Sequence, residues 1–262
     1  MTLKRAVTVL LLAALAALSG CGAGDGRRDP GASVDPGLGA TTYVVTAVTH
    51  DGRPRDVVRG TEIRIRFAGA RVTLTAGCNT MSGGYQLEES RLTLEDLATT
   101  DMGCDPARSA QDSWLAGLFA RPVQLTTGDE PTIVAGSTVL AMADRAQVHP
   151  DKPLLGTRWK LDTLTEGDVA SSVPSDQSAS LRIVGRDLRA NNGCNRGSAR
   201  VLIRNGIIGF SDVVFTTRPC PSSDQVVPAL SAFLDGSGTY GITENRLTIT
   251  HGGHALGFTA AD

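Results

Sequence analysis

The sequence predicts an α+β protein that is rich in β-strand and is built from two tandem small domains. The tripeptide Gly77-Cys78-Asn79 returns as Gly193-Cys194-Asn195, an offset of 116 positions (77 to 193). Self-similarity at one period indicates a duplicated domain. Glycine is abundant, at 30 residues, and aromatic residues form only 4% of the chain, which suits short strands joined by turns. We therefore expect each domain to be a curved, mostly antiparallel sheet with one amphipathic helix.

Residues 1–20 have the features of a lipoprotein signal peptide. A basic start is followed by an apolar stretch over residues 6–17, which is too short for a comfortable membrane span. Leu18-Ser19-Gly20-Cys21 then resembles a bacterial lipobox, in which the cysteine receives a diacylglyceryl thioether and becomes the new N-terminus. The alternative is an ordinary secretory leader with an incidental cysteine. We predict an extracytoplasmic protein that is anchored to the bacterial cell membrane by lipid, palmitate included, on Cys21.

The rest of the chain divides into a tether, two domains and a linker. Residues 21–39 are rich in glycine, proline and charged side chains and have little to bury, which predicts a flexible tether. Domain 1 is expected over residues 40–146 and domain 2 over residues 156–262. The linker between them, residues 147–155, contains two prolines. Each domain, at about 107 residues, is long enough to bury its own core.

Strands in domain 1 are expected wherever apolar and polar residues alternate, because a strand with one buried face has a period of two. One segment, from Pro106 to Ala120, has helical spacing instead. Trp114 and Leu118 lie four residues apart there, on one face, so this segment is the predicted amphipathic helix. The strands are expected around residues 43–48, 63–67, 72–78, 85–87, 92–94, 132–135 and 138–143.

Domain 2 repeats this plan. Residues 201–203 are expected to pair with residues 207–210 through Asn205-Gly206, a dipeptide typical of a type I′ hairpin turn. The helix is expected between Asp224 and Asp235, where Pro228 either delays its start or kinks it. The remaining strands are expected around residues 159–164, 181–188, 247–249 and 256–258.

The charge balance argues against one class of function. The chain has 25 basic and 27 acidic residues, a formal net charge of −2. Neither half contains a basic run or a stripe of basic and aromatic residues, so the sequence lacks the electrostatic footprint of a nucleic-acid-binding protein. We expect no nucleic acid partner.

With Cys21 assigned to lipid, four cysteines remain, two in each domain. Pairing Cys78 with Cys104 and Cys194 with Cys220 is one of three connectivities, and it is the one that respects the repeat. Each disulfide would stabilise its domain by about 3–4 kcal/mol in the chain-entropy model. A zinc site or a redox pair is the alternative, but both usually use Cys-x-x-Cys spacings, which the chain lacks.

Further residues accompany the cysteines in a fixed order. The first copy has Gly77-Cys78-Asn79, Gly83, Tyr85, Thr100, Met102 and Cys104, and the second has Trp159, Leu161, Gly193-Cys194-Asn195, Thr216, Cys220, Leu256 and Phe258. In these blocks the chain resembles the META domain family, also called HslJ-type. It departs from the family pattern at Tyr43, Met142, Ala199, Val201 and Arg218. The resemblance implies a surface or envelope protein loosely tied to stress tolerance, without an established catalytic residue set.

The block of the first copy is the candidate partner surface, through Asn79, Gly83 and Tyr85. The competing interpretation of Asn79 is structural, because an asparagine beside glycine more often caps a turn. His251 and His254 flank two glycines and would need further ligands to hold a divalent metal, so we favour an exposed turn there. The acidic group of Glu88-Glu89 with Glu95-Asp96 has no EF-hand loop and is interpreted as a solvated face.

The sequence lacks the fingerprints of nucleophile-elbow hydrolases, zinc proteases, P-loop proteins and dinucleotide-binding enzymes. We therefore expect no catalysis, no cofactor and no metal site. The predicted protein is a cell-envelope lipoprotein that acts as a binding or envelope-stress and maintenance module. The alternative is an inhibitor or accessory subunit that docks an envelope enzyme or a secretion component. The expected partners are the membrane, through the lipidated N-terminus, and an envelope protein.

Overall fold

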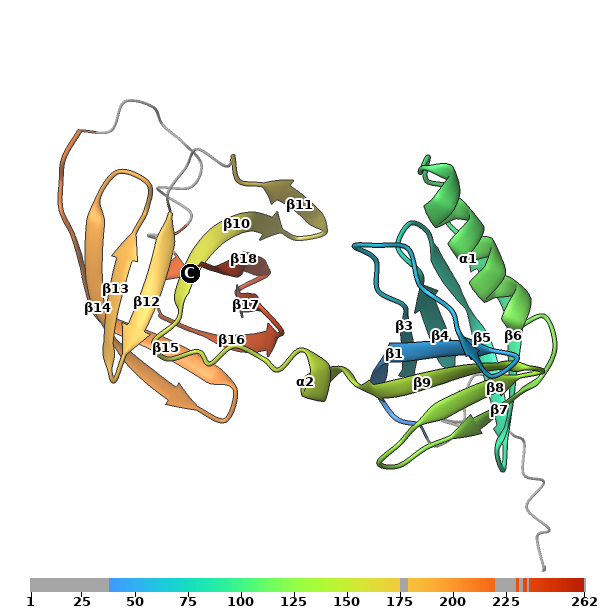
Figure 1. Cartoon of the computed structure of the whole chain (residues 1–262). Helices are drawn as coiled ribbons and strands as arrows, with labels where there is room; N and C mark the ends of the chain where they lie inside the picture. Colours follow the sequence, from blue (N-terminus) through green and yellow to red (C-terminus); the bar gives the residue numbers. More distant parts are fainter. Residues whose placement is uncertain (1–37, 175–178, 220–229, 231–232, 235, 262) are drawn as a thin grey trace, which may run out of the picture. The chain divides into compact units, whose positions relative to one another are not determined.

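The computed structural model describes residues 38–174, 179–219, 230, 233–234 and 236–261. Strands make up 57% and helices 9% of the structure, and the strands form two closed eight-stranded β-barrels (Figure 1). The predicted signal peptide with Cys21, nearly all of the predicted tether and most of the predicted second helix lie outside the described residues.

In the first barrel, strands that follow one another in the chain also lie side by side. From β3 to β9 each strand pairs antiparallel with the next, while β1 joins β3 to β9 and the short β2 extends along β1. The elements of this half are β1 (Thr42–His50), β2 (Arg53–Pro54), β3 (Arg64–Ala68), β4 (Arg71–Thr75), β5 (Thr80–Glu88), β6 (Arg91–Thr99), α1 (Pro106–Leu118), β7 (Val123–Thr126), β8 (Thr132–Ala135) and β9 (Thr138–Asp144).

The first strand closes the barrel because it pairs along both edges. Along one edge it faces β9, from Tyr43 opposite Asp144 to His50 opposite Thr138, and along the other it faces β3 and β2. The predicted α+β class, with a curved, mostly antiparallel sheet and one amphipathic helix in each domain, is therefore wrong. Apolar alternation marks the buried face of a strand but not its partner, so the pattern did not reveal closure. Closure removes the free edges that a curved sheet would leave exposed.

The second barrel repeats this topology, with β10 pairing to both β12 and β18. Even the irregularities recur. A break in register lies between Val45 and Ala47 in β1 and between Leu161 and Thr163, at the same offset, in β10. A bulge changes which residues oppose each other, so the duplication holds at the level of register. The remaining elements are α2 (Arg145–Val148), β10 (Arg158–Glu166), β11 (Val169–Ser172), β12 (Ser180–Val184), β13 (Asp187–Asn191), β14 (Arg196–Arg204), β15 (Ile207–Phe215), β16 (Gly236–Thr243), β17 (Arg246–His251) and β18 (His254–Ala261).

Apolar side chains fill the interior of each barrel. Phe67 in the first barrel and Trp159 and Phe258 in the second are fully buried. The ring of Phe67 meets those of Tyr43 and Tyr85 edge to face, with centroids 6.2 and 5.0 Å apart. Burying a large apolar side chain contributes about 1.5–3 kcal/mol. An eight-stranded barrel is just wide enough for side chains to fill it, so these residues form the core of each domain.

Helix α1 starts where its capping residue dictates. The Asp105 side chain accepts hydrogen bonds from the backbone N–H groups of Ala107 and Arg108, both at 3.1 Å. Such bonds satisfy donors that the first helical turn leaves without partners. Leu115 is fully buried and belongs to the core of the first barrel, so one face of the helix packs on the barrel.

The hairpin between β14 and β15 turns at the dipeptide that the sequence indicates. Asn205 and Gly206 have φ angles of 50° and 76°, both positive as a type I′ turn requires. Arg204 lies opposite Ile207 on either side of the turn. The predicted turn is thus confirmed, and it fixes which residues of the two strands point outward.

Candidate functional site

The Gly-Cys-Asn block of the first copy lies in the loop between β4 and β5. Cys78 forms a disulfide with Cys104, with their Cα atoms 6.2 Å apart, which confirms this predicted pair. The bond fastens the β4–β5 loop to the segment that leads into α1. In the second copy Cys194 is also disulfide-bonded, while its predicted partner Cys220 lies outside the described residues.

Asn79 uses its polar atoms within the domain. Its Oδ1 accepts hydrogen bonds from the Thr100 hydroxyl at 3.0 Å and from the Met102 backbone N–H at 2.8 Å. Its Nδ2 and its backbone N–H both donate to Asp112 Oδ2, at 3.2 and 2.7 Å. The side chain therefore clamps the end of β6 and helix α1 to the β4–β5 loop, which supports the structural interpretation.

Asn195 makes the same clamp in the second barrel. Its Oδ1 accepts from the Thr216 hydroxyl and from the Arg218 backbone N–H, both at 2.8 Å. The position equivalent to Asp112 lies outside the described residues, and the Asn195 backbone N–H donates to Asn192 Oδ1 at 2.8 Å. The contacts of the asparagine with the threonine hydroxyl and with one backbone N–H are common to both copies.

Gly83 and Tyr85, the other residues of the candidate partner surface, face the interior. Tyr85 is 4% exposed, with its ring against Phe67. Gly83 lies at the bulge of β5, where an added Cβ would come within 2.3 Å of the Glu95 carbonyl oxygen. Both residues therefore serve packing, and they offer almost no surface to a partner.

Sequence reasoning missed two buried polar residues of helix α1. Gln111 Oε1 accepts from the Val58 backbone N–H at 2.6 Å, and its Nε2 donates to the Thr61 hydroxyl at 2.8 Å and to the Ala76 carbonyl oxygen. Asp112 beside it is 4% exposed. A helix in which two adjacent polar residues are buried is unusual. The sequence signal for this buried polar pair was the presence of two adjacent polar residues among the apolar residues of the helix.

The histidine pair flanks a turn, and the acidic group extends from the β5–β6 turn into β6. His251 and His254 face each other across the β17–β18 turn, and His251 Nδ1 donates to the Ser237 carbonyl oxygen. In the acidic group at β5 and β6, Glu95 accepts from Gln86 Nε2 at 2.6 Å. Among the described residues, no group of three or more His, Cys, Asp or Glu side chains is placed to hold a metal ion.

One carboxylate of the second barrel has a clearly altered pKa. Burial raises the pKa of Asp162, but hydrogen bonds from the hydroxyls of Thr259 and Thr163 and the charge of Arg246 outweigh burial and lower it. The Thr163 and Arg246 contacts measure 2.7 and 3.0 Å. Asp162 lies on β10 and fastens this strand to β17 and β18, where the barrel closes.

The outer face of β12 to β15 in the second barrel collects arginines and exposed apolar residues. Strand alternation turns these residues outward, and the register places Arg182 opposite Arg189, Asp187 opposite Arg200 and Leu202 opposite Gly209. We call this surface the arginine face. It consists of Arg182, Val184, Arg186, Asp187, Arg189, Arg196, Ser198, Arg200, Leu202, Arg204, Ile207, Gly209, Ser211 and Val214.

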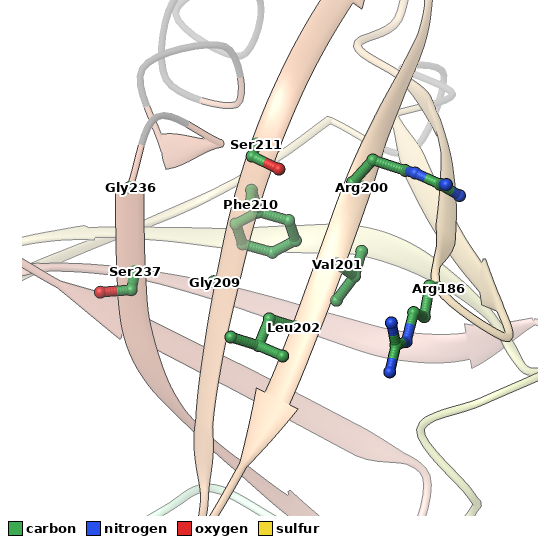
Figure 2. Close-up of a pocket in the computed structure, with 9 residues that line it drawn as sticks. All are labelled: Arg186, Arg200, Val201, Leu202, Gly209, Phe210, Ser211, Gly236 and Ser237. Atoms are coloured by element: carbon green, nitrogen blue, oxygen red, sulfur yellow. The ribbon is translucent and has the colours of Figure 1, made fainter.

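A hollow of about 500 Å³ lies on this face, around the middle of β14 (Figure 2). The basic residues Arg186 and Arg200, the hydroxyl-bearing Ser211 and the apolar Val201, Leu202 and Phe210 line it. The hollow is open to solvent and combines cationic, hydroxyl and apolar groups. Such a lining suits an anionic group attached to an apolar body.

No helix among the described residues is both long and apolar enough to cross a membrane.

Comparisons with known proteins match the two halves separately. A family model described as META domain matches residues 36–147 and again residues 152–262. A comparison with curated proteins finds no match.

Solved structures give matches of low similarity. An NMR structure of a protein from Burkholderia xenovorans has 20% identity and a TM-score of 0.37, covering 45% of this chain and 86% of its own. A second NMR structure has 22% identity and a TM-score of 0.34, covering 40% of this chain and 90% of its own. A DNA polymerase III β sliding clamp from Bartonella birtlesii has 13% identity and a TM-score of 0.18, covering 76% and 55%.

Proposed function

Because this chain belongs to the META domain family, we propose that it is a non-catalytic envelope module that binds through the outside of its barrels. Lipid on Cys21 would hold it at the outer side of the cell membrane. The carrying observation is that core side chains fill the barrels, whereas the arginine face presents a hollow and exposed apolar groups. We assign recognition to the surface on the strength of this hollow and these exposed groups.

The block around Cys78 supports this division of roles. Asn79 and Tyr85 are held within the domain, by hydrogen bonds to Thr100 and Met102 and by packing on Phe67. Residues used in this way stabilise the scaffold. We therefore assign binding to the outward-facing side chains. These side chains differ between the two copies, whereas the core pattern is shared.

Anchoring is tested by expressing the full chain in bacteria fed with a labelled palmitate. The wild-type chain should carry the label, sediment with membranes and be digested by protease added to spheroplasts. Cys21→Ser should abolish the label. Cys194→Ser is the matched control, because it removes a different cysteine and leaves the lipobox intact, so it should keep the label. Equal labelling of wild type and Cys21→Ser would contradict the proposed anchor.

Surface recognition is tested by crosslinking in the native envelope. A photoreactive side chain placed at outward positions such as Leu202 and Ile207, which are 62% and 49% exposed, should capture a neighbour. The same group at outward positions of the first barrel reports whether both copies take part. Turnover of a small molecule that one point substitution abolishes in a folded variant would contradict the non-catalytic assignment.

A further inference from the structure

We propose that the arginine face of the second barrel docks onto a lipid surface that displays anionic phosphate headgroups. The proposal deepens the proposed function, because it names the partner of the barrel surface, and it relies on that function for the nearness of a membrane. Four observations carry it: the charge of the face, the hollow, the exposed apolar side chains and the contrast with the same face of the first barrel.

The charge of this face is strongly unbalanced. It holds six arginines and one acidic residue, Asp187, whose carboxylate pairs with Arg200 at 2.6 Å. Asp212 lies beside it, at the bulge of β15. The excess is specific to this surface, since the whole chain carries a formal net charge of −2. The arginines are Arg182, Arg186, Arg189, Arg196, Arg200 and Arg204.

The duplicated domain offers an internal comparison. At the offset of 116 positions (77 to 193), Arg200 and Arg204 correspond to Gly84 and Glu88, and Ser211 corresponds to Glu95. The equivalent face of the first barrel thus has three arginines, at positions 66, 71 and 91, against two glutamates. The strands that carry this face pair in the same register in both barrels, so the fold does not require the arginines of the second one.

The hollow suits a phosphate group. Arg186 and Arg200 both line the hollow, and their guanidinium groups lie on the side of β14 that faces away from Ser211 (Figure 2). A guanidinium matches phosphate oxygens with two parallel N–H donors and is more weakly hydrated than an ammonium group. The Asp187 carboxylate leaves Arg200 available, because both side chains are well exposed, at 61% and 65%, and exposed pairs contribute little.

The apolar side chains distinguish a lipid surface from a soluble polyanion. Val184, Leu202, Ile207 and Val214 are 54%, 62%, 49% and 65% exposed and lie among the arginines. Their equivalents in the first barrel are Ala68, Gln86, Arg91 and Ala98. A mixed basic and apolar surface gains free energy at a bilayer, where phosphates and acyl chains lie within a few ångströms of each other. A free phosphate or a nucleic acid backbone would interact favourably with the arginines but not with the exposed apolar side chains.

The chain before the first barrel sets how strong this contact must be. The 19 residues from 21 to 39 can span at most about 65 Å. A protein held so close to lipid needs only weak intrinsic affinity, because tethering makes the contact intramolecular. Anionic lipids attract basic residues mainly within a Debye length, so the contact depends on salt.

The test uses the chain from residue 21 onward with Cys21→Ser, so that neither the leader nor an acyl chain carries it onto lipid. Sedimentation is measured with phosphatidylcholine vesicles, with and without phosphatidylglycerol. Binding should require phosphatidylglycerol and weaken as salt rises. Replacing Arg186, Arg200 and Arg204 together by glutamine should lower the partition coefficient by about 100-fold at low salt, roughly fivefold per arginine.

The matched control is the equivalent face of the first barrel. Replacing Arg66, Arg71 and Arg91 together by glutamine removes the same charge and should change binding less than twofold. All six positions carry outward arginines, and equal thermal unfolding temperatures would establish that both triple variants fold. Leu202→Ser with Ile207→Ser should weaken binding to anionic vesicles while leaving the charge unchanged.

The outcomes separate this proposal from its competitors. Equal loss in the two triple variants would overturn it, because it would reduce the contact to overall charge. Equal binding to neutral vesicles, or complete competition by inorganic phosphate at matched phosphate concentration, would also overturn it. Because the probe lacks Cys21, failure of lipid attachment in cells leaves these results unchanged, and the two proposals fail independently.

Discussion

Asn79 and Asn195 hold equivalent backbone groups in the two barrels. Each side-chain oxygen accepts a hydrogen bond from the N–H of the residue 23 positions later (79 to 102, 195 to 218), at 2.8 Å in both cases. Each also accepts from a threonine hydroxyl, at 3.0 and 2.8 Å. The asparagine of the repeated Gly-Cys-Asn motif therefore joins two loops. This structural role accounts for an asparagine in both copies without invoking ligand binding.

Loss of this clamp should destabilise the first barrel. In Asn79→Ala the Met102 N–H and the Thr100 hydroxyl lose their acceptor, and Asp112 Oδ2 loses Nδ2 while keeping the backbone N–H of residue 79. A typical hydrogen bond contributes about 0.5–1.5 kcal/mol to stability. The free energy of unfolding from urea titration should fall by that amount, and Asn195→Ala should behave similarly. Unchanged stability in both variants would assign the asparagines to binding rather than to structure.

Gly83→Ala should be destabilising, because the new Cβ would come within 2.3 Å of the Glu95 carbonyl oxygen. Forcing a methyl group into such a contact typically costs about 1–3 kcal/mol. Gly117→Ala is the control: it lies in helix α1 with no atom within 4 Å of the added Cβ, and it should stabilise by about 0.5–1 kcal/mol. Thermal unfolding should show a lower unfolding temperature for Gly83→Ala and a higher one for Gly117→Ala than for wild type.

Removing the first disulfide should cost stability without redirecting the fold. Cys78→Ser with Cys104→Ser releases a loop of 26 residues, and the chain-entropy model predicts a loss of about 3 kcal/mol. Urea titration of this double variant against wild type measures it. As a redox control, reduction should destabilise wild type by more than it destabilises the variant, because the variant has only the disulfide of Cys194 left to lose. Equal stability of oxidised and reduced wild type would contradict the structural role.

Asp162 should make the second barrel sensitive to acid. Its pKa lies below the ordinary value of 3.8, despite burial, because of Thr259, Thr163 and Arg246. A carboxyl whose folded pKa is lowered stabilises the fold fully above the unfolded pKa, and this contribution disappears as pH falls through the folded pKa. The difference in unfolding temperature between wild type and Asp162→Asn should therefore be largest near neutral pH, begin to shrink as pH approaches the ordinary value of 3.8 and disappear only below the lowered folded pKa. A difference that stays constant down to low pH would rule this origin out.

The repeat carried most of what the sequence could predict. Its offset correctly paired Cys78 with Cys104, and the structure adds that the register breaks of β1 and β10 recur at the same offset. The turn at Asn205-Gly206 followed from local backbone preference. Each of these features depends on residues close in sequence or on the duplication itself.

Closure and the arginine face depend instead on contacts between distant strands. Tyr43 meets Asp144 across the barrel seam, and alternation in either strand carries no information about that pairing. The arginines of the face are spread from Arg182 to Arg204, so no window of sequence holds a basic run. Three strands gather them on one surface, which is why the charge pattern became visible only in the fold.

The central claim is that lipid on Cys21 presents an oxidised pair of barrels at the membrane. The mass of the intact protein purified from bacterial membranes tests it most directly. The account predicts a chain that begins at residue 21, carries a diacylglyceryl group and has no free thiol among Cys78, Cys104, Cys194 and Cys220. An unmodified N-terminus, or four free thiols, would contradict it.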